Sequence, residues 1–153
     1  VEIDHERVLG CIRNDVDVIQ IDIERGLSGF EDHSFDHVII SQALQAMHAT
    51  ERILGEMLRV ADEAVVSFPN FAYQTNRQAI ASGHMPVSED LPYEWYDTPN
   101  VRFFTIADFE ELCDKLGIEV RERLAFDDAG QPVADDPNLN GSLAFYRLGR
   151  KPA

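Results

Sequence analysis

The pattern of apolar and polar positions along the chain alternates between runs of strand length and stripes of helical spacing. Strand-like runs occupy residues 1–3, 16–21, 35–41, 64–68, 118–126 and 142–148. Helical spacing follows the capping residues Asp4, Thr50 and Thr105, and it also fills residues 71–82. The alternation predicts an α/β fold. Its sheet is doubly wound, Rossmann-like and mostly parallel, with helices on both faces and an antiparallel strand pair at the end.

Local signals add detail to three of these elements. The run at 35–41 (FDHVIIS) is almost continuously apolar, which predicts a parallel strand buried on both faces. Thr50 is expected to cap a helix whose apolar stripe is Ile53, Leu54, Met57, Leu58 and Val60. Thr105 and Asp108 have the spacing of a capping box, and Gly117 has the position of a C-terminal glycine. These last three residues therefore mark the two ends of one helix.

Residues 84–104 show neither the helical nor the strand spacing of apolar residues. They contain three prolines, at 86, 92 and 99. A loop of this length in a compact domain is usually either functional or disordered. Its aromatic string places Tyr93, Trp95 and Tyr96 close together. The sequence favours either a lid that faces a substrate or an apolar clasp over the edge of the sheet, and both interpretations stay open.

Composition and charge narrow the class of protein. We assign residues 1–153 to a single domain, because this length suits one hydrophobic core. The formal net charge of −15 argues against a nucleic-acid partner, since phosphate binding needs a basic face. No segment approaches the roughly 18 consecutive apolar residues of a membrane helix. We therefore expect no membrane association.

The two cysteines give no sign of a metal or redox site. Cys11 and Cys113 lie far apart in the sequence, within apolar helical patterns, and no C-x-x-C pair is present. We expect both to be buried reduced thiols that behave as small apolar side chains. Reduced thiols and the absence of metal-ligand spacing favour a cytoplasmic protein without a bound metal.

Two acidic residues follow neighbouring strands, where open α/β sheets bind their ligands. Glu2 ends the first run and could accept hydrogen bonds from ribose hydroxyls, and Asp22 ends the next run and could accept one from an adenine amine. Such a pair suits a neutral or cationic adenosyl ligand better than a phosphate-rich one. The structural alternative is that both residues form turns or cap helices, as Asp4 is expected to do.

Polar groups also follow the strand at 35–41. Ser41 and Gln42 could line a ligand pocket, or they could be a polar strand end that faces water. His48 is a conceivable general base, but a single histidine in a loop usually has no such role. The residues present contain no Ser-His-Asp arrangement and no phosphate-binding glycine loop.

Several strings resemble the methionine-biosynthesis MetW family, and the resemblance covers nearly the whole chain. The most specific string is LPYEWYDTPN at 91–100. The other strings are SQALQA at 41–46, SFPNF at 67–71, MPV at 85–87, FEELC at 109–113 and LGI at 116–118. The similarity is weakest after Asp127. The opening VEID is generic to class I methyltransferases that depend on S-adenosylmethionine (SAM).

The resemblance implies a class I methyltransferase fold, SAM or S-adenosylhomocysteine (SAH) as cofactor, and a role in methionine biosynthesis alongside homoserine O-acyltransferase. Position by position, Glu2 with Ile3 looks like the ribose-binding site, and Asp22 with Ile23 looks like the adenine contact. The wall beside the methionyl group would be Ser41, Gln42 and Leu44. Weaker substrate or lid positions are Asn70, Tyr93, Trp95 and Tyr96. No catalytic residue is implied.

The family's first strand and its glycine-rich loop would precede Val1, so we expect a partial domain that is truncated at its N-terminus. Such a domain should be marginally stable alone, because a strand beside the gap has unpaired backbone groups that cost roughly 1–3 kcal/mol each when buried. It should hold an adenosine but bind SAM weakly.

Three functions remain open at this point. The first is an enzyme that transfers a methyl group, and the second is a non-catalytic regulatory partner of the acyltransferase. The third, a nicotinamide dehydrogenase, is disfavoured by Asp22 and by the reversed last strand pair.

Overall fold

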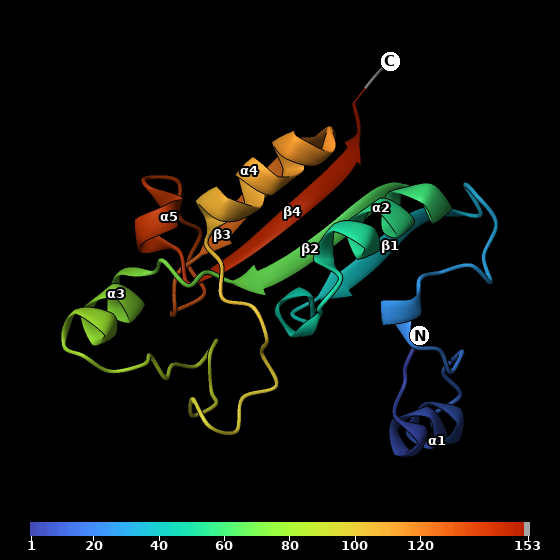
Figure 1. Cartoon of the computed structure of the whole chain (residues 1–153), viewed down its shortest axis with the longest axis horizontal. Coiled ribbons are helices and arrows are strands. Elements are labelled where there is room, and N and C mark those ends of the chain that lie inside the picture. Colours follow the sequence, from blue (N-terminus) through green and yellow to red (C-terminus); the bar gives the residue numbers. More distant parts are fainter. Residues whose placement is uncertain (152–153) are drawn as a thin grey trace.

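The computed structural model describes residues 1–151 and shows an α/β fold built on one four-stranded mixed sheet (Figure 1). The strands are β1 (Phe35–Ser41), β2 (Ala61–Pro69), β3 (Ile118–Phe126) and β4 (Leu143–Arg150). The α-helices are α1 (His5–Arg13), α2 (Thr50–Val60), α3 (Gln74–Ala81), α4 (Ile106–Leu116) and α5 (Pro137–Asn140). Two short 3₁₀ helices are η1 (Ile23–Arg25) and η2 (Leu44–Ala46).

The sheet has the order β1-β2-β4-β3. Strand β1 runs parallel to β2, whereas β4 lies antiparallel between β2 and β3. The expected reversed strand pair at the end of the chain is therefore confirmed. The expectation of a mostly parallel sheet was wrong for the described residues, because only β1 and β2 pair in parallel. In the described part of the chain, β1 pairs only with β2 and is an edge strand.

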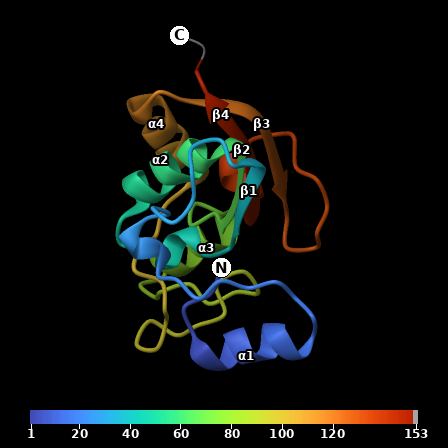
Figure 2. The ribbon, with the colours of Figure 1, turned by 90° about the vertical axis from the view of Figure 1, so that its right-hand side faces the viewer.

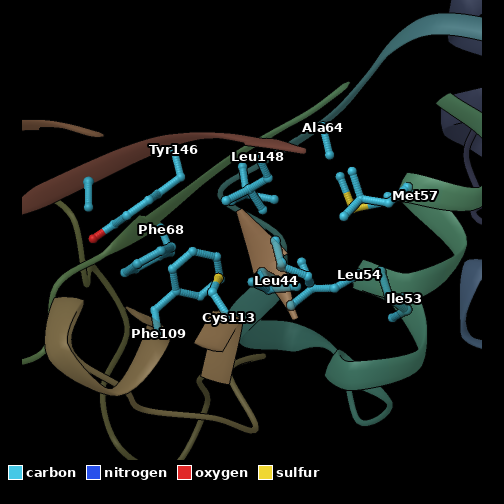
Figure 3. Close-up of a cluster of buried hydrophobic side chains, with 14 of the residues drawn as sticks. Leu44, Ile53, Leu54, Met57, Ala64, Phe68, Phe109, Cys113, Tyr146 and Leu148 are labelled. Atoms are coloured by element: carbon cyan, nitrogen blue, oxygen red, sulfur yellow. The ribbon is translucent and has the colours of Figure 1, made fainter. Parts of the chain in front are cut away.

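The hydrophobic core lies between the sheet and helices α2 and α4, which cover the same face (Figure 2). The expected stripe of α2 is buried in full. It meets an aromatic group in which the ring of Phe68 lies 4.8 Å from that of Phe109 and 5.7 Å from that of Tyr146 (Figure 3). Burial of such rings and aliphatic chains contributes about 1.5–3 kcal/mol for each side chain.

The helix layer predicted for the second face is not formed by residues 1–151. Ile39 on β1 and Leu124 on β3 are 67% and 49% exposed on that face. Strand β1 is thus half-covered, and the expectation that residues 35–41 are buried on both faces was wrong. An apolar run specifies a strand, but its burial depends on neighbours that the run itself does not define.

The N-terminal segment differs most from its prediction. The expected strand at 16–21 is reduced to a single parallel bridge between Glu2 and Gln20, with two backbone hydrogen bonds of 3.1 Å. Val16 and Ile19 are about half exposed, at 53% and 51%. No strand of the described residues lies beside this run on its other side, so the ladder does not extend. Helix α1 forms as expected after its N-cap Asp4 and buries only Val8.

Two helices also begin at residues other than those expected from the sequence. Ala49, not Thr50, occupies the N-cap position of α2, and no side chain caps that helix. Helix α3 begins at Gln74, because the side chain of Asn70 holds residues 70–73 in a turn. Helix α4, by contrast, has the predicted capping box and a left-handed Gly117 at φ +68°.

Candidate functional site

Glu2 lies where the N-terminal segment turns into α1. Its Oε1 accepts hydrogen bonds from the backbone N–H groups of Ile3 and Asp4, at 2.8 and 2.9 Å. These donors, first that of Asp4, hold the pKa of Glu2 below its ordinary value. The other carboxylate oxygen has a single charged neighbour, Arg7, at 3.9 Å. Glu2 is therefore a fixed anion with one oxygen open to a donor.

Asp22 is arranged in a similar way at the start of η1. Its Oδ1 accepts from the N–H of Glu24 at 3.0 Å and caps the 3₁₀ turn, and its Oδ2 lies 3.4 Å from Nε of Arg25. Asp22 thus caps a helix, as the structural alternative proposed for it from the sequence expects. The neighbouring Ile23 is partly buried and faces β1 and α2 across a small cavity.

Glu24 connects this turn to the loop that follows β1. Its carboxylate accepts hydrogen bonds from the backbone N–H groups of His48 and Ala49, the latter at 3.1 Å. These contacts bring the acidic turn beside the start of α2. Thr50 is the first residue of α2, one position after the N-cap Ala49. Sequence reasoning missed Glu24, because its partners lie more than twenty residues away.

A second set of contacts holds the rest of the 23–32 loop on α2. Glu56 Oε2 accepts from the N–H of Leu27 at 2.8 Å, and Arg59 donates to the carbonyl oxygens of Leu27 and Phe30, both at 3.0 Å. Arg59 also pairs with Glu56 at 2.7 Å, and this pairing lowers the pKa of Glu56 to about 2. The loop after Asp22 is consequently anchored at both ends.

Ser41 ends β1 and Gln42 follows it, at the same end of the sheet at which Pro69 ends β2. Gln42 has a left-handed backbone, φ +46°, and its N–H donates to both the carbonyl oxygen and the hydroxyl of Ser67, at 3.0 and 3.1 Å. The hydroxyls of Ser41 and Ser67 lie 3.2 Å apart. Both Ser41 and Gln42 are exposed, so their side chains are open to a ligand or to water.

Leu44 and Asn70 are fully buried instead. Leu44 belongs to the hydrophobic core beneath the loop that follows β1. The Asn70 amide donates to the carbonyl oxygen of Gly141 at 2.8 Å, and its Oδ1 accepts from the N–H groups of Ala72 and Ile106, at 3.1 and 3.2 Å. Asn70 thus joins three loops, which is a structural role and leaves no exposed atom for a substrate.

The aromatic residues of the 84–104 loop are open to solvent. Tyr93, Trp95 and Tyr96 are 48%, 70% and 69% exposed. Trp95 and Tyr96 contact each other edge to face, with ring centroids 5.6 Å apart. Side chains this exposed cannot form an apolar clasp, so that interpretation was wrong. A surface role for the loop is left.

Two cavities lie near these residues. One of about 60 Å³ lies between the N-terminal segment and β1, lined by Val1, Ile23 and Ile40 among others. A larger one of about 530 Å³ lies between the start of α2 and α4 and is lined by His48 but by none of the expected cofactor contacts. No set of three acidic, histidine or cysteine side chains in residues 1–151 is placed to hold a metal ion.

Glu2 and Asp22 offer hydrogen-bond acceptors with apolar side chains next to them. Glu2 and Asp22 are two fixed carboxylates, each with one oxygen that no backbone group occupies. Exposed Ile3 and partly buried Ile23 supply apolar surface next to them. Carboxylate oxygens accept hydrogen bonds from hydroxyl and amine groups, and apolar side chains can pack on a ring face.

Comparison with solved structures defines the fold class. A SAM-dependent methyltransferase from Thermotoga maritima superposes with a TM-score of 0.68 at 18% identity, over 98% of this chain and 71% of that one. A SAM-dependent methyltransferase from Mesorhizobium loti gives 0.66 at 14% identity, over 97% and 78%. The fold is therefore of the SAM-dependent methyltransferase type.

Sequence comparison gives the particular family. The family model described as methionine biosynthesis protein MetW matches residues 1–148. The bifunctional methionine biosynthesis protein MetXA/MetW of Rhodopirellula baltica is 39% identical over 158 residues, which cover 98% of this chain. The chain spans about a quarter of that relative's length (25%). The chain belongs to the MetW family, whose role is in methionine biosynthesis.

In the described part of the chain, no helix combines the length and the apolar character that a membrane crossing requires.

Proposed function

We propose that this MetW chain binds SAM or SAH by the adenosine half and acts as a methyltransferase-type domain of methionine biosynthesis. The observation that carries the proposal is the pair of fixed carboxylates, Glu2 and Asp22, on two segments joined by the bridge at Gln20. Glu24 ties the second segment to the loop after β1. The methyltransferase-like fold of the chain supports the same ligand.

In this proposal each side chain has a separate task. Glu2 accepts hydrogen bonds from the ribose hydroxyls, and Asp22 accepts one from the adenine amine. Ile3 and Ile23 pack against the adenosine, and Ser41 with Gln42 borders the methionyl side. Bound SAM supplies an electrophilic methyl group. Its transfer depends mainly on in-line positioning of the acceptor, so it does not require a general base on the chain.

A second candidate function is a non-catalytic regulatory partner of homoserine O-acyltransferase. The observation that favours it is the Rhodopirellula relative, whose name combines MetXA and MetW in one bifunctional polypeptide. Proteins that are fused in one organism often associate as separate chains in another. We therefore propose that this chain associates with the acyltransferase, whether or not it transfers a methyl group.

Calorimetric titration with SAM, SAH and NAD tests the ligand. We expect heat of binding for SAM and SAH and weaker binding for NAD, because the residues present contain no glycine loop to hold its diphosphate. Binding of NAD in preference to SAM would contradict the proposal.

An acyltransferase assay separates the two candidate functions. We expect the chain to change the acyltransferase rate when it is added in stoichiometric amount, with SAM and without. If the enzyme neither binds the chain nor responds to it, the regulatory candidate is wrong and the methyltransferase candidate is left.

A further inference from the structure

The 84–104 loop gathers exposed apolar side chains to an extent unusual for a loop. Seven large apolar residues in it are at least 38% exposed: Met85, Val87, Tyr93, Trp95, Tyr96, Val101 and Phe103. Isolated apolar residues on a surface are ordinary, but a contiguous group marks an interaction surface. Trp and Tyr in particular are enriched among residues that dominate the energy of protein interfaces.

Buried side chains and backbone hydrogen bonds hold the loop against the rest of the protein. Pro86 and Leu91 are buried, and the N–H groups of Val101 and Arg102 both donate to the carbonyl oxygen of Gln45, at 3.0 and 2.9 Å. At the end of the loop, the carbonyl oxygen of Phe104 accepts a hydrogen bond from the N–H of Phe71, which follows β2. Aromatic side chains on an anchored loop lose little conformational freedom when they dock, which favours binding.

A small-molecule site is a poor match for the exposed rings of this loop. The hollow beside Tyr93 and Trp95 has a volume of only about 10 Å³. The segment also reaches two larger cavities, of about 350 and 530 Å³, but Tyr93, Trp95 and Tyr96 line neither of them. Ligand pockets are usually 300–1,000 Å³ and enclose most of their ligand. The exposed rings project from the surface instead, which is the shape of the inserting partner in a protein interface.

The charge around the rings selects the kind of partner. The loop carries four carboxylates, and among residues 1–151 none of them takes part in an ion pair: Glu89, Asp90, Glu94 and Asp97. Arg102 is the single basic residue other than histidine in the segment. An apolar centre with an acidic rim is complementary to an apolar recess rimmed by lysine and arginine.

We propose that the 84–104 loop is the surface by which this chain docks on homoserine O-acyltransferase. Trp95 and Tyr96 enter an apolar recess of that enzyme, and the loop carboxylates meet basic residues at its rim. This inference rests on the association proposed above, and it adds the surface through which the two proteins would contact each other.

Binding of the full chain to the acyltransferase of the same organism tests the proposal. We expect Trp95→Ala with Tyr96→Ala to weaken the affinity at least 100-fold in a biosensor titration. The matched control is Leu124→Ala, which removes an exposed apolar side chain from β3 and should change the affinity less than twofold. Glu94→Gln with Asp97→Asn should slow association and flatten its dependence on salt.

A second readout uses the unmutated chain. Trp95 is the only tryptophan, so 5-fluorotryptophan incorporation gives a single ¹⁹F resonance at the centre of the proposed surface. Addition of the acyltransferase should shift or broaden that resonance strongly, because the ring passes from water into a protein recess. This measurement does not depend on how a variant folds.

Three outcomes would overturn the proposal. If the wild-type chain does not bind the acyltransferase, the association itself fails, and the docking surface fails with it. If the wild-type chain binds and the double variant binds equally, the association stands and only the surface is wrong. Ultracentrifugation gives the third outcome. If the wild-type chain is a dimer, the double variant is a monomer and the affinity for the enzyme is unchanged, the loop joins two copies of this chain instead.

Discussion

At the scale of single residues, Asn70 shows how one polar side chain organises the region around the carboxyl end of β2. It is fully buried, and its amide bonds to backbone groups of three separate loops. A buried backbone group that loses its partner costs roughly 1–3 kcal/mol. The turn after β2, the start of α4 and the turn before β4 therefore depend on this residue.

We expect Asn70→Ala to lower the free energy of unfolding by about 3 kcal/mol or more, since at least three strong hydrogen bonds are lost. Urea denaturation followed by circular dichroism measures the loss. Asn14→Ala is the matched control, because its amide makes one exposed bond to Gly10 and should cost under about 1 kcal/mol. Equal effects of the two substitutions would contradict the role assigned to Asn70.

Glu56 gives a prediction for pH. Its pKa in the folded chain is about 2, against an ordinary value of 4.5, first because Arg59 donates to the carboxylate. A depressed pKa stabilises the fold above about pH 4.5, and this contribution is lost as the pH falls toward 2. We expect Glu56→Gln to be destabilised at pH 7 and to lose stability less steeply between pH 5 and about pH 2.

Denaturant unfolding at several pH values provides the measurement for Glu56. Glu51→Gln is a suitable control, because Glu51 forms only an exposed pair with Lys115. A pH dependence that is identical in wild type and Glu56→Gln would show that Glu56 does not hold the loop after Asp22.

At the scale of elements, α1 and the segment around Glu2 are the least supported part of the fold. Helix α1 buries one side chain, Val8, whereas α2 buries five. The segment before α1 is held by a single bridge and by one hydrogen bond from the Gln20 side chain to the carbonyl oxygen of Ile3. Local opening of such a unit requires little free energy.

We therefore expect the backbone amides of α1 to exchange with solvent at least tenfold faster than those of α2. Hydrogen exchange followed by mass spectrometry compares the two helices in one sample, so α2 serves as the internal control. Equal protection of the two helices would mean that α1 packs more tightly than the structure indicates. Bound SAH should slow exchange at the residues around Glu2.

The elements that could be predicted from the sequence are those that depend on interactions between residues close together in the chain. The capping box of Thr105 and Asp108, and the apolar stripe of α2, depend on residues a few positions apart, and both are confirmed. The strand at 16–21 and the burial of 35–41 depend on which strands lie alongside. An apolar run does not contain that information, and both expectations were wrong.

The same distinction applies to the candidate site. Glu2 and Asp22 could be selected from the sequence because each follows an apolar run. Glu24 could not, because its carboxylate binds backbone groups at His48 and Ala49 that leave no trace in residue type. Ser67 was also missed, although its register opposite Ser41 follows once β1 and β2 are paired.

At the scale of the whole molecule, strand β1 pairs on one side only among the described residues, and apolar side chains near that edge stay exposed. An open edge with exposed apolar surface lowers stability and favours self-association. The marginal stability expected of the 153-residue chain stays a prediction.

We predict that the 153-residue chain alone unfolds in a broad transition below the roughly 45–65 °C at which mesophilic domains melt. Calorimetry together with ultracentrifugation measures both the transition and the oligomeric state. A sharp, cooperative transition of a monomer within or above that range would show that the β1 edge is not a weakness.

Calorimetric titration of the chain with SAH and with adenosine tests whether Glu2 and Asp22 hold the adenosine half of the ligand. We predict similar affinities for both compounds. We also predict at least tenfold weaker binding after Glu2→Gln or Asp22→Asn, since a hydrogen bond to a charged group contributes about 1.5–3 kcal/mol. Asp17→Asn changes an exposed carboxylate nearby and should have no effect. If Glu2→Gln and Asp22→Asn bind SAH as tightly as wild type, the adenosine does not bind there.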